Sequence, residues 1–167
     1  MAAQDIITVE QVRERLNYDS ETGVFTWRMN RGSRARLGSV VGSDDMHGYK
    51  TVRLGNRSYK LHRLAWLHTH GIWPTGDIDH INGVRTDNRI MNLRDVSRKV
   101  NLQNQRKAPN NKSTGVLGVY IDKYRRRYYS TISVNNKSVG LGSFDTIQEA
   151  QEAYVAAKRK LHEGCML

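Results

Sequence analysis

Apolar residues near the N-terminus recur with the spacing of a helix. Val9, Val12 and Leu16 fall on one helical face. Thr8 and Gln11, three residues apart, form a capping-box pattern that favours a helix start at Thr8. The pattern therefore predicts a short N-terminal helix that packs on the residues following it.

Short strand-like runs come next. Residues 18–23 have turn chemistry and lead into residues 24–27, whose side chains favour a strand. Residues 49–54 and 57–61 are alternating runs, and the Gly-Asn pair between them is a hairpin signal. This part of the chain is therefore predicted to form small sheets.

The middle of the chain combines both kinds of spacing. Residues 61–70 carry an apolar stripe with helical spacing, and Gly71 is the predicted end of that helix. Residues 76–81 predict a strand, an Asn-Gly turn follows, and residues 90–96 predict a returning segment. Ser97 is a favourable N-cap for a helix that reaches about residue 106. The prediction is a strand pair followed by a helix.

The pattern changes again after a polar segment at residues 107–115, which predicts a linker. Strands are predicted at residues 116–120, 128–134 and 137–144. Thr146 and Glu149 then form a capping box for a helix whose apolar residues recur at three and four positions: Ile147, Ala150, Tyr154, Ala157 and Leu161.

Together these elements predict an α+β fold in four parts. An N-terminal helix with a basic strand and hairpin region covers residues 1–60, and a central strand-strand-helix segment covers residues 61–106. The linker at residues 107–115 leads to residues 116–167, a three-stranded antiparallel sheet packed on one helix. Only 38% of the residues are hydrophobic, which favours small modules over one large globule.

The charge of the chain points to a class of partner. Lys and Arg total 27 against 16 Asp and Glu, which gives a formal net charge of +11. Such an excess favours a polyanionic partner, and nucleic acid is the leading class. No apolar run approaches the ~20 residues that a spanning helix needs, so no membrane partner is expected.

Cysteine usage indicates the compartment. Cys165 is the single cysteine, which permits neither an internal disulfide nor a zinc cage built from cysteines. The first five residues lack the basic start and the apolar core of a signal peptide. A cytoplasmic location is therefore expected.

Basic residues gather before the central segment. Residues 28–37 carry four arginines and no acid, which fits equally a solvated loop and an arm that tracks phosphates. Residues 47–75 contain no Asp or Glu, so their positive charge is uncompensated. The residues predicted to contact DNA in this part are Arg31, Arg34, Arg36, Arg53, Arg57 and Lys60.

Residues with hydrolytic chemistry gather at residues 76–104. Asp79 and His80 adjoin at the predicted strand end, and a series of asparagines follows: Asn82, Asn88, Asn92, Asn101 and Asn104. A neutral imidazole beside a carboxylate that can hold a cation is the minimum equipment for activating water against a phosphodiester. This is a hypothesis about a site.

Each of these residues also has a structural interpretation. An Asp-His pair is common, Asn92 can cap a local backbone group, and Asn101 can be a solvated helix position. Asn88 is interpreted as making a structural loop bond. Taken together, at this spacing and in so basic a chain, the residues favour a site.

Other polar residues near this stretch receive supporting roles. Arg85 and Arg89 are predicted phosphate contacts. His68 and His70 are two residues apart and do not share a helical face, so the histidines of the helix at residues 61–70 are interpreted as surface or structural. His62 is the least clearly assigned of them.

Three motifs follow one another in the order and approximate spacing of a known family. They are HRLAW at residues 62–66, IDHINGVRTDNRIMNLR at residues 78–94 and NLQN at residues 101–104. They resemble the HNH endonuclease family, especially its phage and intron-borne branch, whose third motif residue is Asn. The resemblance implies a small ββα-metal nuclease core. The implied roles are metal ligand for Asp79 and Asn101, general base for His80, and loop brace for Asn92.

The resemblance also implies a cofactor, one divalent cation per site. An Asn at position 101, where many relatives have His, offers a hard oxygen in place of an imidazole, which favours Mg²⁺ or Mn²⁺ over zinc. His80 must be neutral to accept a proton, and the ordinary histidine pKa of about 6.5 leaves most of it neutral at cellular pH.

The C-terminal part carries a second resemblance. GVLGVY at residues 115–120 and LGSFDTIQEAQEAY at residues 141–154 resemble the plant-type APETALA and ethylene-response DNA-binding domain, with Tyr128-Tyr129 where the pattern usually has Trp. The sheet of that family enters the major groove. The resemblance therefore implies a DNA face formed by Tyr120, Lys123, Arg125, Arg126, Arg127 and Tyr129. The alternative is that these residues form a solvated turn.

The sequence thus predicts a metal-dependent DNA endonuclease of the phage homing or nicking type, located in the cytoplasm of a bacterial host. Double-stranded DNA is the expected partner, and a monomer that cuts one strand per event is expected, with two copies acting together as an alternative. The main competing hypothesis is a non-catalytic, sequence-specific DNA-binding regulator with a decayed HNH core. An RNA-binding protein is a third hypothesis.

Overall fold

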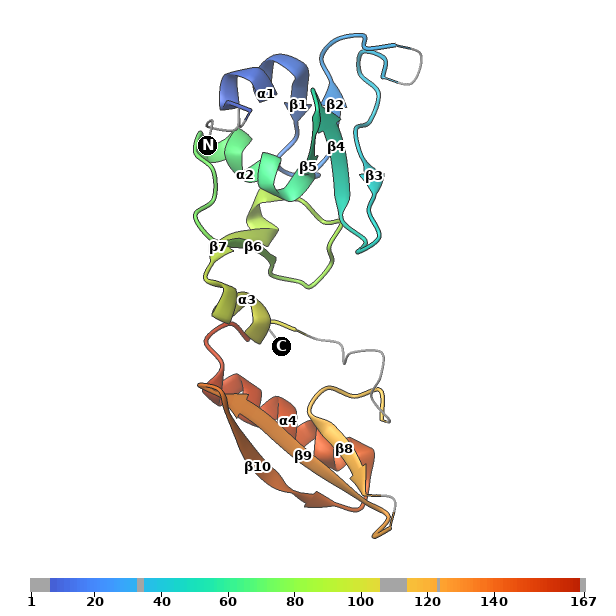
Figure 1. Cartoon of the computed structure of the whole chain (residues 1–167), viewed down its shortest axis with the longest axis vertical. Helices are drawn as coiled ribbons and strands as arrows, with labels where there is room; N and C mark the ends of the chain where they lie inside the picture. The colour runs from blue at the N-terminus through green and yellow to red at the C-terminus, as the bar shows by residue number, and fades with distance from the viewer. Residues whose placement is uncertain (1–6, 33–34, 106–113, 123, 166–167) are drawn as a thin grey trace. The chain divides into compact units, whose positions relative to one another are not determined.

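The computed structural model describes residues 7–32, 35–105, 114–122 and 124–165. The chain divides into two compact units, Met1–Val96 and Ser97–Leu167 (Figure 1). Each unit is described by itself below.

The first unit begins with the predicted helix, α1 (Val9–Arg15). The Thr8 hydroxyl accepts a hydrogen bond from the Gln11 backbone, and the Gln11 side chain accepts one from the Thr8 backbone, so the capping box is confirmed. The chain then passes directly into β1 (Leu16–Tyr18), which pairs antiparallel with β2 (Phe25–Trp27). The strand predicted at residues 24–27 is therefore confirmed, while β1 was not predicted.

A second small sheet follows, with strand order β3-β4-β5. It consists of β3 (Ser43–Asp44), β4 (Lys50–Leu54) and β5 (Arg57–Lys60), all antiparallel. The predicted hairpin is β4-β5, and Gly55 in its turn has a φ of 64° that favours glycine.

The long helix of this unit, α2 (Leu61–His70), starts directly after β5 and matches its predicted range. Gly71 ends it in the left-handed conformation. The buried face of α2 presents Leu61, Leu64 and Ala65 to the same core as Leu16 and Phe25. Burial of this face holds the two small sheets and α2 together, because neither sheet has enough apolar surface to be stable alone.

The predicted strand pair is formed by β6 (Asp77–His80) and β7 (Leu93–Val96), which run antiparallel. A short 3-10 turn, η1 (Ile90–Asn92), leads into β7, so the returning segment predicted at residues 90–96 is a strand only in its second half. The strand spacing did not reveal this turn, since three residues are too few to show a period.

The second unit contains α3 (Arg98–Gln103), which Ser97 caps through its hydroxyl. This helix is shorter than predicted because Asn104 already ends it, with its N–H donating to carbonyls of the last turn. Lys158 Nζ donates to the Gln105 carbonyl, and the Gly164 N–H donates to Gln103 Oε1 at 3.1 Å. The end of α3 is therefore fixed to the C-terminal part of its own unit.

The rest of this unit is a three-stranded antiparallel sheet of order β10-β9-β8, with one helix packed on it (Figure 1). The strands are β8 (Val119–Asp122), β9 (Arg127–Val134) and β10 (Lys137–Phe144), and the helix is α4 (Ile147–Leu161). The Thr146 and Glu149 capping box of α4 is confirmed, as is the Asn135-Asn136 turn between β9 and β10.

The described part of the chain thus mixes helices with small antiparallel sheets, which agrees with the predicted α+β class. The central segment predicted at residues 61–106 spans the division between the two units, and the predicted domain boundaries stay predictions. Within the described ranges, no helix has the length and apolar character that crossing a membrane requires.

We predict that Gly118→Ala destabilises the second unit. Gly118 has a φ of 75°, and a Cβ there would clash with the Tyr154 ring and lie 2.9 Å from the Thr131 carbonyl oxygen. Strain and overpacking should lower the free energy of unfolding by about 1–3 kcal/mol. Hydrogen exchange of the β8, β9 and β10 amides in increasing urea measures this loss.

Gly140→Ala is the matched control, because Gly140 lies in β10 with open space around its Cα. Alanine suits a strand better than glycine does, so this variant should be neutral or slightly stabilising. Equal exchange rates in the two variants would contradict the account of Gly118.

Candidate active site

Asp79 and His80 end β6 and are both buried. The antiparallel register places Asp79 opposite Arg94 and His80 opposite Leu93 on β7. Successive residues of a strand point to opposite faces, so the carboxylate and the imidazole project in different directions from one strand end.

The Asp79 carboxylate is held by an ion pair. Arg94 donates to Asp79 Oδ2 from Nε at 2.8 Å and from Nη2 at 2.7 Å. Because the Asp79 side chain is only 7% exposed, this pair lies in a partly desolvated place where charge-assisted hydrogen bonds are strong. Arg94 therefore fixes the orientation of the carboxylate.

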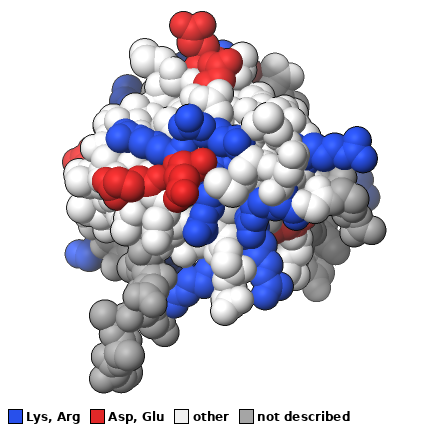
Figure 2. Space-filling model, turned by 90° about the horizontal axis from the view of Figure 1, so that it is seen from above, with Lys and Arg blue, Asp and Glu red and all other residues white. Residues whose placement is uncertain are grey.

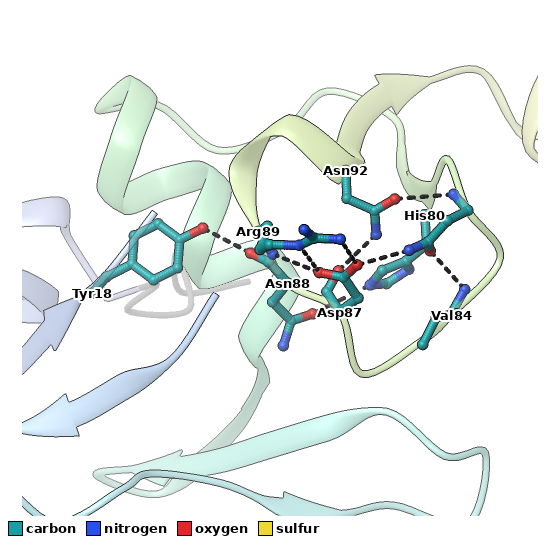
Figure 3. Close-up of polar contacts among 8 residues, drawn as sticks. Tyr18, His80, Val84, Asp87, Asn88, Arg89 and Asn92 are labelled. Carbon is teal, nitrogen blue, oxygen red and sulfur yellow. Dashed lines mark hydrogen bonds and ion pairs between the residues drawn. The ribbon is translucent and has the colours of Figure 1, made fainter. Parts of the chain in front are cut away.

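The His80 ring is held by Asn88. His80 Nε2 lies 3.2 Å from Asn88 Oδ1 (Figure 3). An amide oxygen can only accept, so Nε2 carries the hydrogen, and Nδ1 carries the lone pair of the neutral ring. Burial lowers the pKa of His80 from its ordinary value, against the opposing effects of the Asn88 bond and the Asp79 charge. The ring is thus neutral at physiological pH, with the lone pair on Nδ1.

Asn88 is itself held by the N-terminal part of the unit. The Tyr18 hydroxyl donates to the Asn88 carbonyl at 2.7 Å, and Asn88 is 2% exposed. Burial raises the pKa of Tyr18 to about 12, so the hydroxyl remains a donor. Gly23, with a φ of 73°, approaches so closely that a Cβ would lie 2.5 Å from the Asn88 carbonyl carbon. The β1-β2 turn therefore sets the position of Asn88.

The loop between β6 and β7 is closed by hydrogen bonds of its own (Figure 3). Asn92 Oδ1 accepts from the Asn82 N–H at 2.9 Å, and Asn92 Nδ2 donates to the Asp87 carbonyl at 2.8 Å. Asn82 Nδ2 donates to Asp87 Oδ2 at 2.7 Å, and Arg89 donates to both Asp87 oxygens. The Arg89 bonds are the main reason that the pKa of Asp87 falls to about 2.

His62 on α2 lies against His80. The two ring centroids are 5.1 Å apart in an edge-to-face arrangement, and His62 is 5% exposed. Burial, followed by the charges of His80 and Lys60, lowers the pKa of His62 to about 3. Among the described residues, no group forms a hydrogen bond with the buried Nδ1 of His62.

Asn101, the second predicted metal ligand, lies on α3 in the other unit and is half-buried. Its partnership with Asp79 therefore stays a prediction. The described residues contain no cluster of three His, Cys, Asp or Glu side chains suited to a metal ion.

Part of the chain is similar to a known family. Residues 59–103 match the family model described as HNH endonuclease. This HNH segment runs from β5 to α3 and contains Asp79, His80 and Asn92. The match supports a nuclease of the HNH kind. No curated protein and no solved structure matches the chain, and no comparison supports the APETALA-like resemblance of the C-terminal part.

The HNH segment also contains two residues whose place at the site was missed. Asn88 was assigned a structural loop bond and His62 a surface or structural role, yet both contact the His80 ring. His62 opens the HRLAW motif, which was itself a signal. Asn88 carried no such signal, because one asparagine among many does not reveal a tertiary contact.

The predicted DNA contacts are mostly on the surface. Figure 2 shows Lys and Arg side chains spread over the face seen from above, with acidic groups among them. Arg34 and Lys123 lie outside the described residues, and Arg57, Lys60, Arg127 and Tyr129 are half-buried. The exposed members of the predicted set are Arg31, Arg36, Arg53, Arg85, Arg89, Tyr120, Arg125 and Arg126.

We predict that His62 makes stability fall at acid pH. The pKa of His62 is about 3 in the folded chain against 6.5 in a free side chain, so the unfolded chain binds the proton first as the pH falls. The stabilising contribution of neutral His62 is complete above about pH 6.5 and is lost towards pH 3, by up to about 1.4 kcal/mol per pH unit.

His62→Phe keeps a ring but removes the titration, so its free energy of unfolding should fall less than that of the wild type between pH 7 and pH 5. Urea unfolding followed by tryptophan fluorescence measures this, since every tryptophan lies in the first unit. His47→Gln, at an exposed histidine, is the control. Parallel pH dependences of the wild type and His62→Phe would contradict the prediction.

Proposed function

We propose that this chain is a metal-dependent DNA endonuclease of the HNH kind with a phage homing or nicking role. The observation that carries the proposal is the His80–Asn88 bond, which directs Nδ1 of a neutral imidazole to act as proton acceptor inside the HNH segment. In the proposal, β6, β7 and α3 are the ββα-metal core.

His80 Nδ1 accepts a proton from the attacking water while Asn88 keeps the hydrogen on Nε2. The water oxygen bonds to phosphorus, the bond from phosphorus to O3′ breaks, and the departing oxygen takes a proton from solvent. The products are a 5′ phosphate and a 3′ hydroxyl, as the family resemblance implies. A divalent cation, when bound, would supply neutralisation of the negative charge that develops in this step.

Asp79 and Asn101 are the residues that would hold this cation. One carboxylate and one amide oxygen are hard donors, and Mg²⁺ commonly completes such a set with waters and substrate phosphate oxygens. The donor chemistry therefore fits Mg²⁺ or Mn²⁺. Arg94 holds the Asp79 carboxylate through Oδ2, which fixes its orientation.

Asn92 is assigned the brace of the loop between β6 and β7. Its two side-chain hydrogen bonds to Asn82 and Asp87 support that role. A braced loop keeps Asn88 opposite His80, so Asn92 acts as a positioning residue.

The second unit is proposed to bind double-stranded DNA through its sheet. Tyr120 and Tyr129 pair directly across β8 and β9, and the turn between these strands exposes Arg125 and Arg126. Aromatic and cationic side chains side by side suit the surface of a nucleic acid. The proposed enzyme acts as a monomer and cuts one strand per event.

A second candidate is a non-catalytic DNA-binding regulator with a decayed core. The Arg94–Asp79 ion pair favours it, because a guanidinium holds a carboxylate oxygen that a cation would use. Incubating supercoiled plasmid with the protein in Mg²⁺, Mn²⁺ or EDTA separates the two candidates. Plasmid that stays intact with every metal would support the regulator.

We predict that His80→Ala loses cleavage and keeps DNA binding. Loss of a general base should reduce the rate by about 10²–10⁴-fold. Plasmid nicking in Mg²⁺ measures the rate, and gel mobility shift in EDTA measures the affinity. His70→Gln, at the exposed end of α2, is the control for loss of a histidine. Unchanged cleavage by His80→Ala would refute the assignment.

We predict that Asn88→Leu lowers kcat by about tenfold and leaves KM nearly unchanged, because the ring loses the acceptor that holds it in a productive orientation. Asn88→Asp restores an acceptor oxygen and should recover most of the activity. A structural role alone would not give this recovery, provided that thermal unfolding shows both variants to be folded. Equal losses in the two variants would argue against the role of the bond.

A further inference from the structure

Two cations share one aromatic ring near His80. Lys60 Nζ lies 4.1 Å from the centroid of the Tyr49 ring, and Arg85 Cζ lies 5.1 Å from the same centroid. Tyr49 precedes β4, Lys60 ends β5, and Arg85 belongs to the loop after β6. Three separate segments of the first unit therefore bring these side chains together.

The same ring borders the proposed general base. The Tyr49 centroid is 6.0 Å from that of His80 and 5.1 Å from that of His62. Arg85 contributes to lowering the pKa of His80, and Lys60 contributes to lowering that of His62, which agrees with this closeness. The ring that both cations contact thus lies near the proposed general base.

A turn centred on Asp45 holds the group in place. Asp45 Oδ1 accepts from the Tyr49 N–H at 2.9 Å and from the His47 N–H at 2.8 Å. Arg85 Nη1 donates to the His47 carbonyl at 2.7 Å, and Lys60 Nζ lies 3.8 Å from Asp45 Oδ2. The cations are therefore positioned before any ligand arrives.

The charges of this group do not balance. Asp45 faces Lys60, while the described hydrogen bond of Arg85 goes to a neutral carbonyl. Two cations on one aromatic ring, with one carboxylate facing them, leave a net positive charge that attracts an anion. The Lys60 side chain is 40% exposed and Arg85 is exposed, so an anion from solution can reach both.

We propose that Lys60 and Arg85 form the subsite for the scissile phosphate and that Tyr49 positions them. The planar guanidinium of Arg85 donates hydrogen bonds to the non-bridging phosphate oxygens, and the ammonium group of Lys60 attracts them as a compact charge. This proposal rests on the proposed nuclease function. It identifies the side chains that bind the phosphate attacked by the water that His80 activates. Tyr49 acts through its ring, so it is a positioning residue.

Salt dependence of binding tests the phosphate contacts without any cleavage. In EDTA, the full chain is titrated with a 30-bp duplex at several salt concentrations. Lys60→Gln and Arg85→Gln should each reduce the log-log salt slope by about one. Lys160→Gln, at an exposed lysine on α4 of the other unit, removes the same charge from a helix that the proposal does not assign to DNA and should leave the slope unchanged. Unchanged slopes in Lys60→Gln and Arg85→Gln would overturn the subsite, whether or not the protein cuts DNA.

A phosphate-by-phosphate scan identifies which phosphate is bound. In a series of duplexes that contain the mapped cleavage position, each duplex has a different single phosphate replaced by a neutral methylphosphonate. The wild type should lose about tenfold in affinity when the scissile phosphate is neutral, and the double variant of Lys60→Gln and Arg85→Gln should lose nothing further there. Arg31→Gln, at a predicted DNA contact outside the subsite whose cation lies 5.0 Å from the Trp27 ring centroid, is the matched control and should still lose about tenfold at the scissile phosphate. If the double variant instead lost its sensitivity to a methylphosphonate at a different phosphate, the assignment to the scissile phosphate would be overturned.

Tyr49 variants test the positioning role. Tyr49→Leu removes the ring that holds both cations and should lower kcat by about tenfold at saturating DNA. Tyr49→Phe keeps the ring and should recover most of kcat, and thermal unfolding checks that both variants fold. Equal kcat values in the two variants would overturn the role of the ring. If the wild type cuts no DNA with any metal, the nuclease proposal fails, while the salt slopes still decide the phosphate contacts.

Discussion

The hydrogen bond between His80 Nε2 and Asn88 Oδ1 is the contact on which the candidate active site depends. It fixes which ring nitrogen can accept a proton, and it requires Asn88 to be buried and immobile. The Tyr18 hydroxyl and the close approach of Gly23 meet that requirement from the start of the chain. The β1-β2 pair and its turn therefore form the support behind the proposed general base.

The carboxylates of the first unit are largely committed to structure. Asp79 pairs with Arg94, Asp87 with Arg89, and Asp45 and Asp95 accept backbone N–H groups that shape turns. Acidic groups with internal partners stabilise loops and contribute little negative field at the surface. The excess of Lys and Arg is then what an approaching polyanion meets first, and the Tyr49 ring concentrates two of these cations beside His80.

Local patterns predicted the elements and missed the contacts between them. The capping boxes at Thr8 and Thr146, the hairpin turn at Gly55 and the end of α2 at Gly71 each depend on a few neighbouring residues, so the sequence was enough to predict them. Asp79 and His80 were predicted as site residues from motif spacing, and their roles stay predictions. The contacts of Asn88, His62 and Tyr49 with His80 arise from packing between distant segments, and no local pattern encodes them.

The position of Asn101 shows why the HNH segment is not self-sufficient. Asn101 lies on α3, whose end is held by Lys158 from α4 and by Gly164 beyond it. Lys158 is 1% exposed, and a Cβ on Gly164 would lie 3.0 Å from Gln103 Cβ, so the packing at both points is tight. A six-residue helix is too short to be stable alone. The orientation of Asn101 within its own unit is therefore determined by residues far outside the matched segment.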